Sequence, residues 1–214
     1  MAGIEIMLIN KNKSPVLLKL ITQVLCILAL AFSANSYALE SSVQLHKVDQ
    51  DKSFGYSLSV GGDFFNQKAF NWQVNYNRFE NVMISDLDKI SPEWADAKLD
   101  FTIQTVDLTL GYRYYPQSYD KFISSLIVDF QLGASVNLSE NKLIFPPEII
   151  EVDDLYFSNQ GDVNPVISIS LQKVFTKNSA MHVGFKHYPS YSDFGSISSF
   201  YIGFKYRFGR QVGY

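Results

Sequence analysis

The chain has very few of the residues that build disulfide frameworks and transition-metal sites. Its 214 residues include one cysteine, Cys26, and three histidines. A disulfide needs two cysteines, and a structural zinc site takes about four cysteine or histidine ligands. The sequence therefore predicts a fold that is held together without disulfides, and it predicts no metal cluster of cysteine and histidine.

An excess of positive charge is also missing. The formal net charge is −3, and because residues 1–38 carry three lysines and one glutamate, the rest of the chain carries −5. Proteins that bind nucleic acids neutralise phosphates with clustered lysine and arginine. Nucleic acid is therefore excluded as a partner.

Long apolar runs are almost absent. The one clear run, Leu20 to Phe32, spans 13 residues, fewer than the roughly 20 that a helix needs to cross a bilayer. Lysines precede this run, and the small residues of a cleavage site follow at 36–38. We predict a signal peptide at residues 1–38 and a mature domain at residues 39–214, with an uncleaved N-terminal anchor as the alternative.

What the chain does have is a regular alternation of apolar and polar residues. In the segment from Phe70 to Asn77, every even position is large and apolar and every odd position is an amide. A strand with this period has one apolar face and one polar face. The same pattern predicts eight strands, at about 41–48, 54–65, 69–80, 99–115, 121–138, 164–175, 179–188 and 197–208.

The polar faces of these strands carry ionised side chains, whereas the apolar faces are rich in aromatic residues. A soluble lipocalin-like barrel or a β-sandwich is the alternative, but it would have to bury the charges or expose the aromatic rings. We therefore predict an all-β fold, an eight-stranded antiparallel up-and-down transmembrane β-barrel with a polar lumen. Parity changes near Gln104, since Phe101 and Ile103 are apolar at odd positions, and we expect a β-bulge there.

The links between the strands alternate in length. Those at 66–68, 116–120 and 177–178 are short, whereas 81–98, 139–163 and 189–196 are longer. Bacterial outer-membrane barrels have short periplasmic turns and long external loops. The pattern predicts an outer-membrane protein with its N-terminus in the periplasm.

An eight-stranded barrel is just wide enough for its own side chains to fill. The predicted inward residues of opposite charge form a polar plug, and a proton or ion path is the alternative. The members of this plug are Asp63, Asp107, Asp129, Arg113, Lys186, Lys205 and Arg207.

The longest external loop, 139–163, combines acidic residues with an apolar segment. Such carboxylates, next to a phosphate-rich lipopolysaccharide leaflet, would share Mg²⁺ or Ca²⁺ with it, or would form a solvated acidic rim. Otherwise no cofactor is expected. The apolar part is a contact patch for a host or surface ligand, or the loop's own packing. The candidate surface-loop residues are Phe145, Glu148, Glu151, Asp153 and Asp154.

The segment from Met181 to Ser190 places His187 on the outward face, near the external rim. In this it resembles the lipid A 3-O-deacylases (the PagL family), small barrels with a catalytic histidine and serine on the outside of the penultimate strand. The resemblance implies an esterase with His187 as base. Because Pro189 occupies the expected serine position, the nucleophile would be Ser190 or Ser192, and Asp193 would orient the base.

The whole mature chain also resembles the small outer-membrane β-barrel superfamily of opacity-type, OmpX-like and accessory-colonisation-type surface proteins, in length, leader, strand count and aromatic last strand. This resemblance implies outer-membrane lipids as partners, and recognition of the last strand by the barrel-assembly machinery. The preferred function is a non-enzymatic surface barrel for adhesion or envelope integrity. A lipid A esterase is the alternative, and a small solute channel is a third hypothesis.

Overall fold

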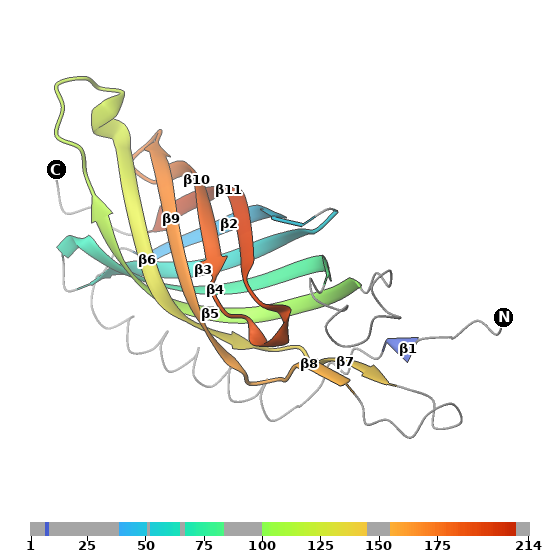
Figure 1. The fold of residues 1–214 in the computed structure, drawn as a ribbon. Helices are drawn as coiled ribbons and strands as arrows, with labels where there is room; N and C mark the ends of the chain where they lie inside the picture. Colours follow the sequence, from blue (N-terminus) through green and yellow to red (C-terminus); the bar gives the residue numbers. More distant parts are fainter. Residues whose placement is uncertain are drawn as a thin grey trace.

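The structure, a computed structural model, describes residues 7–8, 39–50, 52–64, 67–83, 100–144 and 155–208. Eight strands form a closed barrel in which every neighbouring pair is antiparallel (Figure 1). The eight-stranded fold expected from the alternation is confirmed. The barrel strands are β2 (Leu39–Val48), β3 (Phe54–Phe64), β4 (Gln67–Met83), β5 (Asp100–Tyr114), β6 (Leu126–Asn137), β9 (Val163–Val174), β10 (Ser179–Tyr188) and β11 (Ile197–Phe208).

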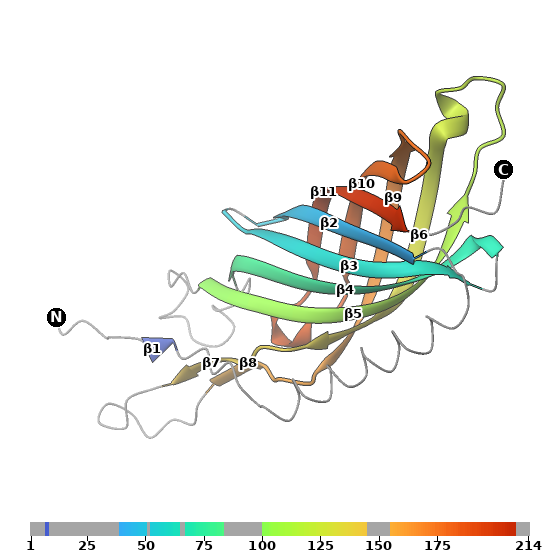
Figure 2. The same cartoon turned by 180° about the vertical axis from the view of Figure 1, so that it is seen from behind.

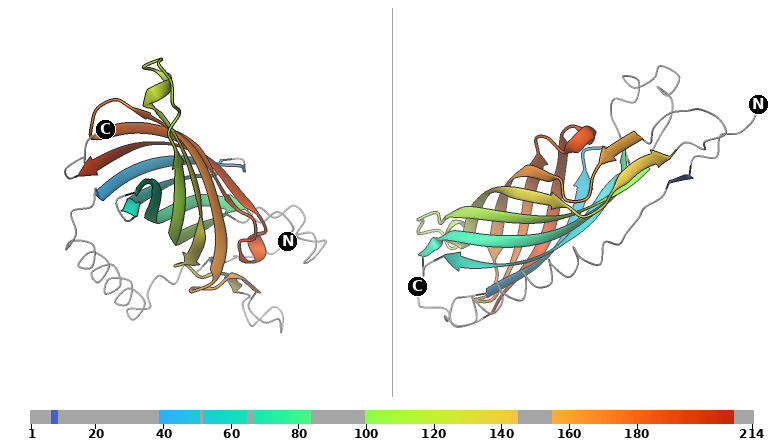
Figure 3. Two further views of the ribbon diagram at one scale, coloured as in Figure 1. Left: turned by 90° about the vertical axis from the view of Figure 1, so that its left-hand side faces the viewer. Right: turned by 90° about the horizontal axis from the view of Figure 1, so that it is seen from below.

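The barrel closes where the last strand pairs with the first, from Phe208 opposite Leu39 to Ser199 opposite Val48. We call the end where β2 begins and β11 finishes the terminal end, and the opposite end the loop end (Figure 3). The links β3–β4, β5–β6 and β9–β10 lie at the terminal end. Among the described residues, no helix is long and apolar enough to cross a membrane.

A second, small sheet lies beyond the loop end. Strands β7 (Asn141–Ile144) and β8 (Leu155–Ser158) pair with each other, and β1 (Met7–Leu8) pairs with the free edge of β7. Figures 1 and 2 show this sheet projecting away from the barrel. The described part of the long link between β6 and β9 therefore contains a pair of antiparallel strands, which the alternation did not indicate.

The side chains alternate around the barrel wall as predicted. On β5, Leu108 and Leu110 are more than half exposed, whereas Asp107 and Thr109 between them are buried. Aromatic residues gather on the outside near the terminal end, where the ring of Phe70 lies 5.5 Å from that of Tyr112. The exterior is therefore an apolar belt, and the charged side chains are buried in the interior.

Two details of the prediction are wrong. The register of β4 and β5 does shift opposite Ile103 and Phe101, close to the expected place, but the extra residue lies on β4, between Phe79 and Val82, where Asn81 has a φ of 57°. Phe101 and Ile103 keep the parity of β5 and point into the barrel, where both are buried. The prediction assumed that every inward position is polar. At the loop end the lumen is apolar, so apolar residues at odd positions of β5 still point inward.

The link at 116–120 is also not a tight turn. Residues 115–125 separate β5 from β6 and include the 3₁₀ turn η3 (Ile123–Ser125), so β6 begins at Leu126 and not at residue 121. The Asp120 side chain accepts the backbone N–H of Phe122 at 2.7 Å, and its carbonyl accepts that of Ser124. These local bonds stabilise a turn where a strand was expected.

Candidate functional site

The described part of the lumen holds an ionic cluster near the terminal end. It has three carboxylates and three cationic groups, and each carboxylate lies within 4 Å of at least two of the cations. The cluster therefore has no formal net charge, which is the condition under which buried ions are tolerated. Its members are Glu40, Asp63, Asp129, Arg113, Lys205 and Arg207.

Arg113 is at the centre of this ionic cluster. Its guanidinium contacts Glu40 at 2.6 Å, Asp63 at 2.8 Å and Asp129 at 3.4 Å. Arg207 approaches the same cluster from the last strand, donating from Nε to Glu40 at 2.8 Å. Carboxylates from β2, β3 and β6 thus meet at one cation on β5, which links these strands across the lumen.

Two of the predicted plug residues form a separate pair nearer the loop end. The Lys186 ammonium lies 3.0 Å from Asp107 and donates to Asn77 at 2.8 Å. The Tyr188 hydroxyl donates to the same Asp107 carboxylate at 3.1 Å. The seven predicted residues therefore belong to two polar layers, and Glu40 joins the layer at the terminal end.

Beyond this pair, the loop end of the lumen is filled by an apolar cap. The ring of Phe194 lies 5.5 Å from that of Phe101 and 6.3 Å from that of Phe157, so that the β10–β11 link closes over the barrel. The cap comprises Val48, Phe79, Val82, Phe101, Ile103, Phe157, Val166, Tyr188, Tyr191, Phe194 and Ile197.

The β10–β11 link is tied down by hydrogen bonds as well as by packing. The Tyr191 hydroxyl donates to Asn137 at 2.7 Å, and the Ser192 hydroxyl donates to Asp162 at 3.0 Å. Burial raises the pKa of the Tyr191 phenol well above its ordinary value, so it remains a neutral donor. The cap is thus a fixed part of the fold.

The candidate esterase residues are not brought together as the resemblance implied. The Nδ1 atom of His187 lies 2.9 Å from the hydroxyl of Ser198, its partner across the strands. The hydroxyl of Ser192 bonds instead to Asp162, and Ser190 is exposed in the following link. The side chain of Asp193 lies outside the described residues. The structure thus forms a histidine–serine pair with a serine that the sequence did not single out.

One acidic residue, Asp49, is a neighbour of the serine of this pair and not of its histidine. The backbone N–H of Asp49 donates to the carbonyl of Ser198 at 2.8 Å, so Asp49 flanks Ser198 on the β2 side, opposite His187. In a catalytic triad the carboxylate contacts the histidine and not the serine. The pair therefore has a nucleophile and a base but no described carboxylate that orients the base.

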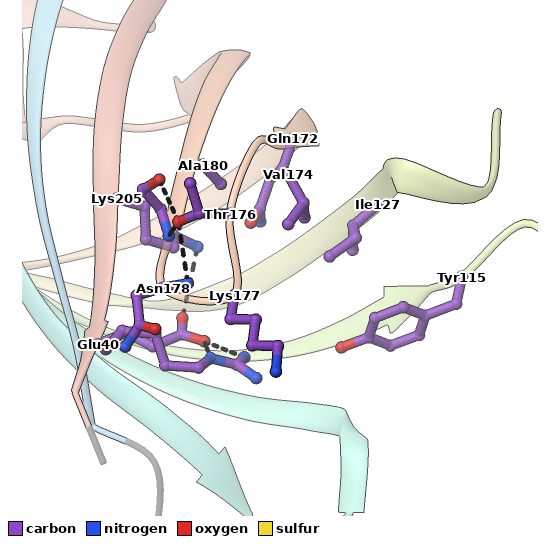
Figure 4. A pocket seen from close by; sticks show the side chains of 12 residues that line it. Glu40, Tyr115, Ile127, Gln172, Val174, Thr176, Lys177, Asn178, Ala180 and Lys205 are labelled. Atoms are coloured by element: carbon purple, nitrogen blue, oxygen red, sulfur yellow. Dashed lines mark hydrogen bonds and ion pairs between the residues drawn. The ribbon is translucent and has the colours of Figure 1, made fainter. Parts of the chain in front are cut away.

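A small cavity of about 50 Å³ opens at the terminal end, next to the ionic cluster. Figure 4 shows Glu40 and Lys205 on one side of it and Tyr115 on the other. No group of three or more metal-ligating side chains occurs within the described ranges. The candidate surface-loop residues Phe145, Glu148, Glu151, Asp153 and Asp154 lie outside those ranges.

Sequence reasoning missed Glu40, Ser198 and the apolar cap. Glu40 shares the even parity of Ser42, Gln44 and His46, which are all buried, so assigning faces on the first strand would have found it. Ser198 occupies an outward position of β11 but has no motif of its own. The sequence held one indication of the cap. Tyr188, the residue after His187, is a large aromatic residue at an inward position, where a polar residue was expected.

Comparison with known proteins finds similar folds but no similar sequences. No family model and no curated protein matches the sequence. The solved structures that match include neisserial surface protein A, with 12% identity, 81% of this chain and 98% of that chain covered and a TM-score of 0.53. The N-terminal barrel domain of OprF from Pseudomonas aeruginosa matches with 12% identity, 80% and 97% coverage and a TM-score of 0.51. A major outer membrane protein of Thermus thermophilus matches with 11% identity, 81% and 100% coverage and a TM-score of 0.51.

These similarities are at the level of the fold. Together with a closed barrel that carries its apolar side chains outside, they define the chain as a small eight-stranded β-barrel of the bacterial outer membrane. Outer-membrane barrels have short periplasmic turns and longer extracellular loops, and by that rule the loop end is expected to be the external one.

Proposed function

We propose that the protein is a non-enzymatic surface barrel, which presents its external loops for adhesion or for envelope integrity. The observation that carries this proposal is the filled lumen. The ionic cluster occupies its periplasmic end, the Lys186–Asp107 pair lies nearer the loop end, and the apolar cap fills the external end, so the described residues leave no path for a solute. The surface left for function is the external one.

The β7–β8 hairpin is the part of that surface best suited to contact a host or surface ligand. It projects from the barrel, yet it is anchored at its base, because Phe157 belongs to the apolar cap and the Asn141 amide donates to Ser158 at 3.0 Å. The base of the hairpin is thereby fixed to the barrel. Loop residues 145–154 then form the contact patch.

The test replaces residues 145–154 by a short Gly-Ser turn and leaves Phe157 in place, so that the cap persists. We expect cells that express this variant to lose binding to host cells or abiotic surfaces, while the purified barrel keeps its heat-modifiable gel migration. A matched control replaces residues 117–119 in the periplasmic turn and should leave binding intact. Unchanged binding by the loop variant would contradict the adhesion role.

The acidic external loops also fit a role in envelope integrity. We propose that Glu148, Glu151, Asp153 and Asp154 share Mg²⁺ or Ca²⁺ with lipopolysaccharide phosphates, since oxygen ligands suit both ions. Changing these four residues to amides should sensitise cells to detergent as chelation does. If sensitivity does not change, the loop carboxylates have no such role.

A second candidate function rests on the His187–Ser198 pair. A histidine 2.9 Å from a serine hydroxyl on the lipid-facing surface is the minimum for acyl transfer from an ester. His187 would accept the proton as Ser198 Oγ attacks the acyl carbonyl, would return it to the departing alcohol, and would then activate water to release the acid.

Mass spectrometry of lipid A separates the two candidates. If the esterase exists, cells with the wild-type protein lack one acyl chain, and the chain returns in both His187→Ala and Ser198→Ala but not in Ser192→Ala. Identical lipid A with and without the protein removes this candidate and leaves the surface-barrel proposal standing.

We further propose that the barrel-assembly machinery recognises β11. Its outward residues Phe200, Ile202, Phe204, Tyr206 and Phe208 are all exposed at the barrel wall. Changing Phe208 to serine should slow assembly in cells and cause the unfolded chain to accumulate in the periplasm. Normal assembly of this variant would count against recognition through that residue.

A further inference from the structure

Between the two charged layers of the lumen lies a layer with polar atoms that have no partner. Both ring nitrogens of His182 and the Oε1 atom of Gln44 are buried and make no hydrogen bond within the described chain. The two residues are only 3% and 5% exposed. The Gln44 amide has one weak contact, from Nε2 to Ser42 at 3.5 Å.

The two residues lie on the strands on either side of one glycine. Gly203 on β11 is the register partner of His182 on one side and of Gln44 on the other. A Cβ atom at Gly203 would lie 2.6 Å from His182 Nε2, so the imidazole extends over the glycine toward the strand that carries Gln44. The absence of a side chain at position 203 therefore makes room for the imidazole.

The neighbouring side chains do not supply the missing partners. The Tyr201 ring is 5.7 Å from that of His182, but its hydroxyl is bonded to Ser168 at 3.1 Å. The Gln172 amide, opposite His182 on β9, donates to Asp129 at 2.9 Å. A buried polar atom without a partner destabilises the fold, so three such atoms in one layer need an explanation.

Water is the ligand that fits these atoms. A neutral imidazole offers one donor and one acceptor, and the Gln44 carbonyl oxygen is an acceptor. Internal water is found where two to four polar partners surround a small space. We propose that this layer holds internal water, one molecule of which bridges His182 Nε2 and Gln44 Oε1 and exchanges with the periplasm.

The route of exchange follows from the two ends of the lumen. The terminal cavity is lined by Gln172 and Ala180, which adjoin His182 across and along the sheet, and by Lys205, two residues from Gly203 (Figure 4). The external end is filled by the apolar cap. Water therefore enters and leaves this layer from the periplasmic side only.

A crystal structure of the detergent-solubilised full chain, at a resolution that shows ordered water, tests the proposal directly. The expected result is density about 2.7–3.2 Å from both His182 Nε2 and Gln44 Oε1. A direct hydrogen bond between the two side chains would overturn the proposal. So would an anomalous peak at this position in bromide-soaked crystals, because it would identify an anion site.

A thermodynamic test does not depend on crystals. His182→Phe, Gln44→Leu and the double variant form a cycle in which bridged residues should show coupling of at least about threefold in the unfolding equilibrium constant. The control cycle combines His182→Phe with Arg78→Ala on the outer surface and should be additive. Additivity in the first cycle overturns the bridge. If a lumen variant fails to fold, the crystallographic result decides.

Discussion

Arg113 holds Glu40 with two hydrogen bonds across the width of the barrel, from Nη1 to Oε1 at 2.9 Å and from Nη2 to Oε2 at 2.6 Å. The two residues lie on β5 and β2, which are separated in the barrel wall by β3 and β4. A paired, planar contact of this kind fixes both distance and orientation. It joins the first strand to the middle of the chain, so we expect the barrel to depend on it.

Removing one member of this pair should be more harmful than removing both. Arg113→Leu leaves an uncompensated buried carboxylate and Glu40→Leu leaves a surplus cation, and each should lower the free energy of unfolding by about 3–5 kcal/mol. The double variant keeps the ionic cluster neutral and should cost less than the sum. Urea unfolding in lipid vesicles measures all three.

The exposed ion pair between Arg78 and Glu80, at 3.0 Å, provides the control for that experiment. Arg78→Ala should change the free energy of unfolding by no more than about 1 kcal/mol. If the buried double variant loses as much as its two single variants together, the pairing does not carry the stability assigned to it.

The apolar cap predicts a closed pore. Phe194→Ala removes a buried ring from the cap and should cost about 3–5 kcal/mol. The wild-type protein should show no conductance above noise in a planar bilayer, because the lumen is filled. Phe204→Ala on the outer wall, where the ring is 50% exposed, should leave the cap intact and serves as the control. Discrete wild-type channel openings would contradict the sealed lumen.

The lipid-facing belt predicts a strong penalty for charge. Leu132 is 63% exposed in the middle of β6, and Leu132→Arg should destabilise the inserted barrel by about 2–4 kcal/mol. Tyr119 is fully exposed in the periplasmic turn, where the same change to arginine should be almost neutral. Folding into vesicles, followed by gel migration without heating, compares the two variants. Equal stability of both would mean that Leu132 does not meet acyl chains.

Close approach of two strands predicts an effect at Gly133. A Cβ atom there would lie inside the contact distance of the Leu108 carbonyl oxygen, which is a backbone atom and moves only with its strand. Gly133→Ala should therefore disturb the β5–β6 pairing and lower the unfolding free energy by more than about 1 kcal/mol. Ala134→Ser, the next residue on the outer face, is the control. Wild-type stability of Gly133→Ala would show that the pairing relaxes without cost.

Most of the fold was predictable because one physical rule governs the barrel wall. Lipid on one side and a polar lumen on the other give each strand a period of two, and β10 and β11 have the predicted bounds. The rule fails where a side chain meets neither environment. Phe101 and Ile103 lie inside the cap. The apolar residues that pack there, such as Phe157 and Phe194, come from parts of the chain that are distant in sequence.

The sites were less predictable because they depend on pairing between strands. The inward charges could be read from parity, but their division into two layers follows from the stagger of the strands. His187 was identified from its outward position, whereas its contact with Ser198 requires the β10–β11 register. The link at 115–125 was misread because the bonds of Asp120 to its own backbone outweigh the apolar residues that follow.

In this barrel the apolar side chains face acyl chains, and the ionic cluster is enclosed in the lumen. Spin labels at positions 108, 110 and 132, placed one at a time in the vesicle-bound mature domain 39–214, which has no cysteine of its own, report which environment these side chains meet. Relaxation by oxygen, which concentrates in lipid, should exceed relaxation by a water-soluble nickel complex at all three positions. Strong relaxation by the nickel complex at these positions would contradict the account.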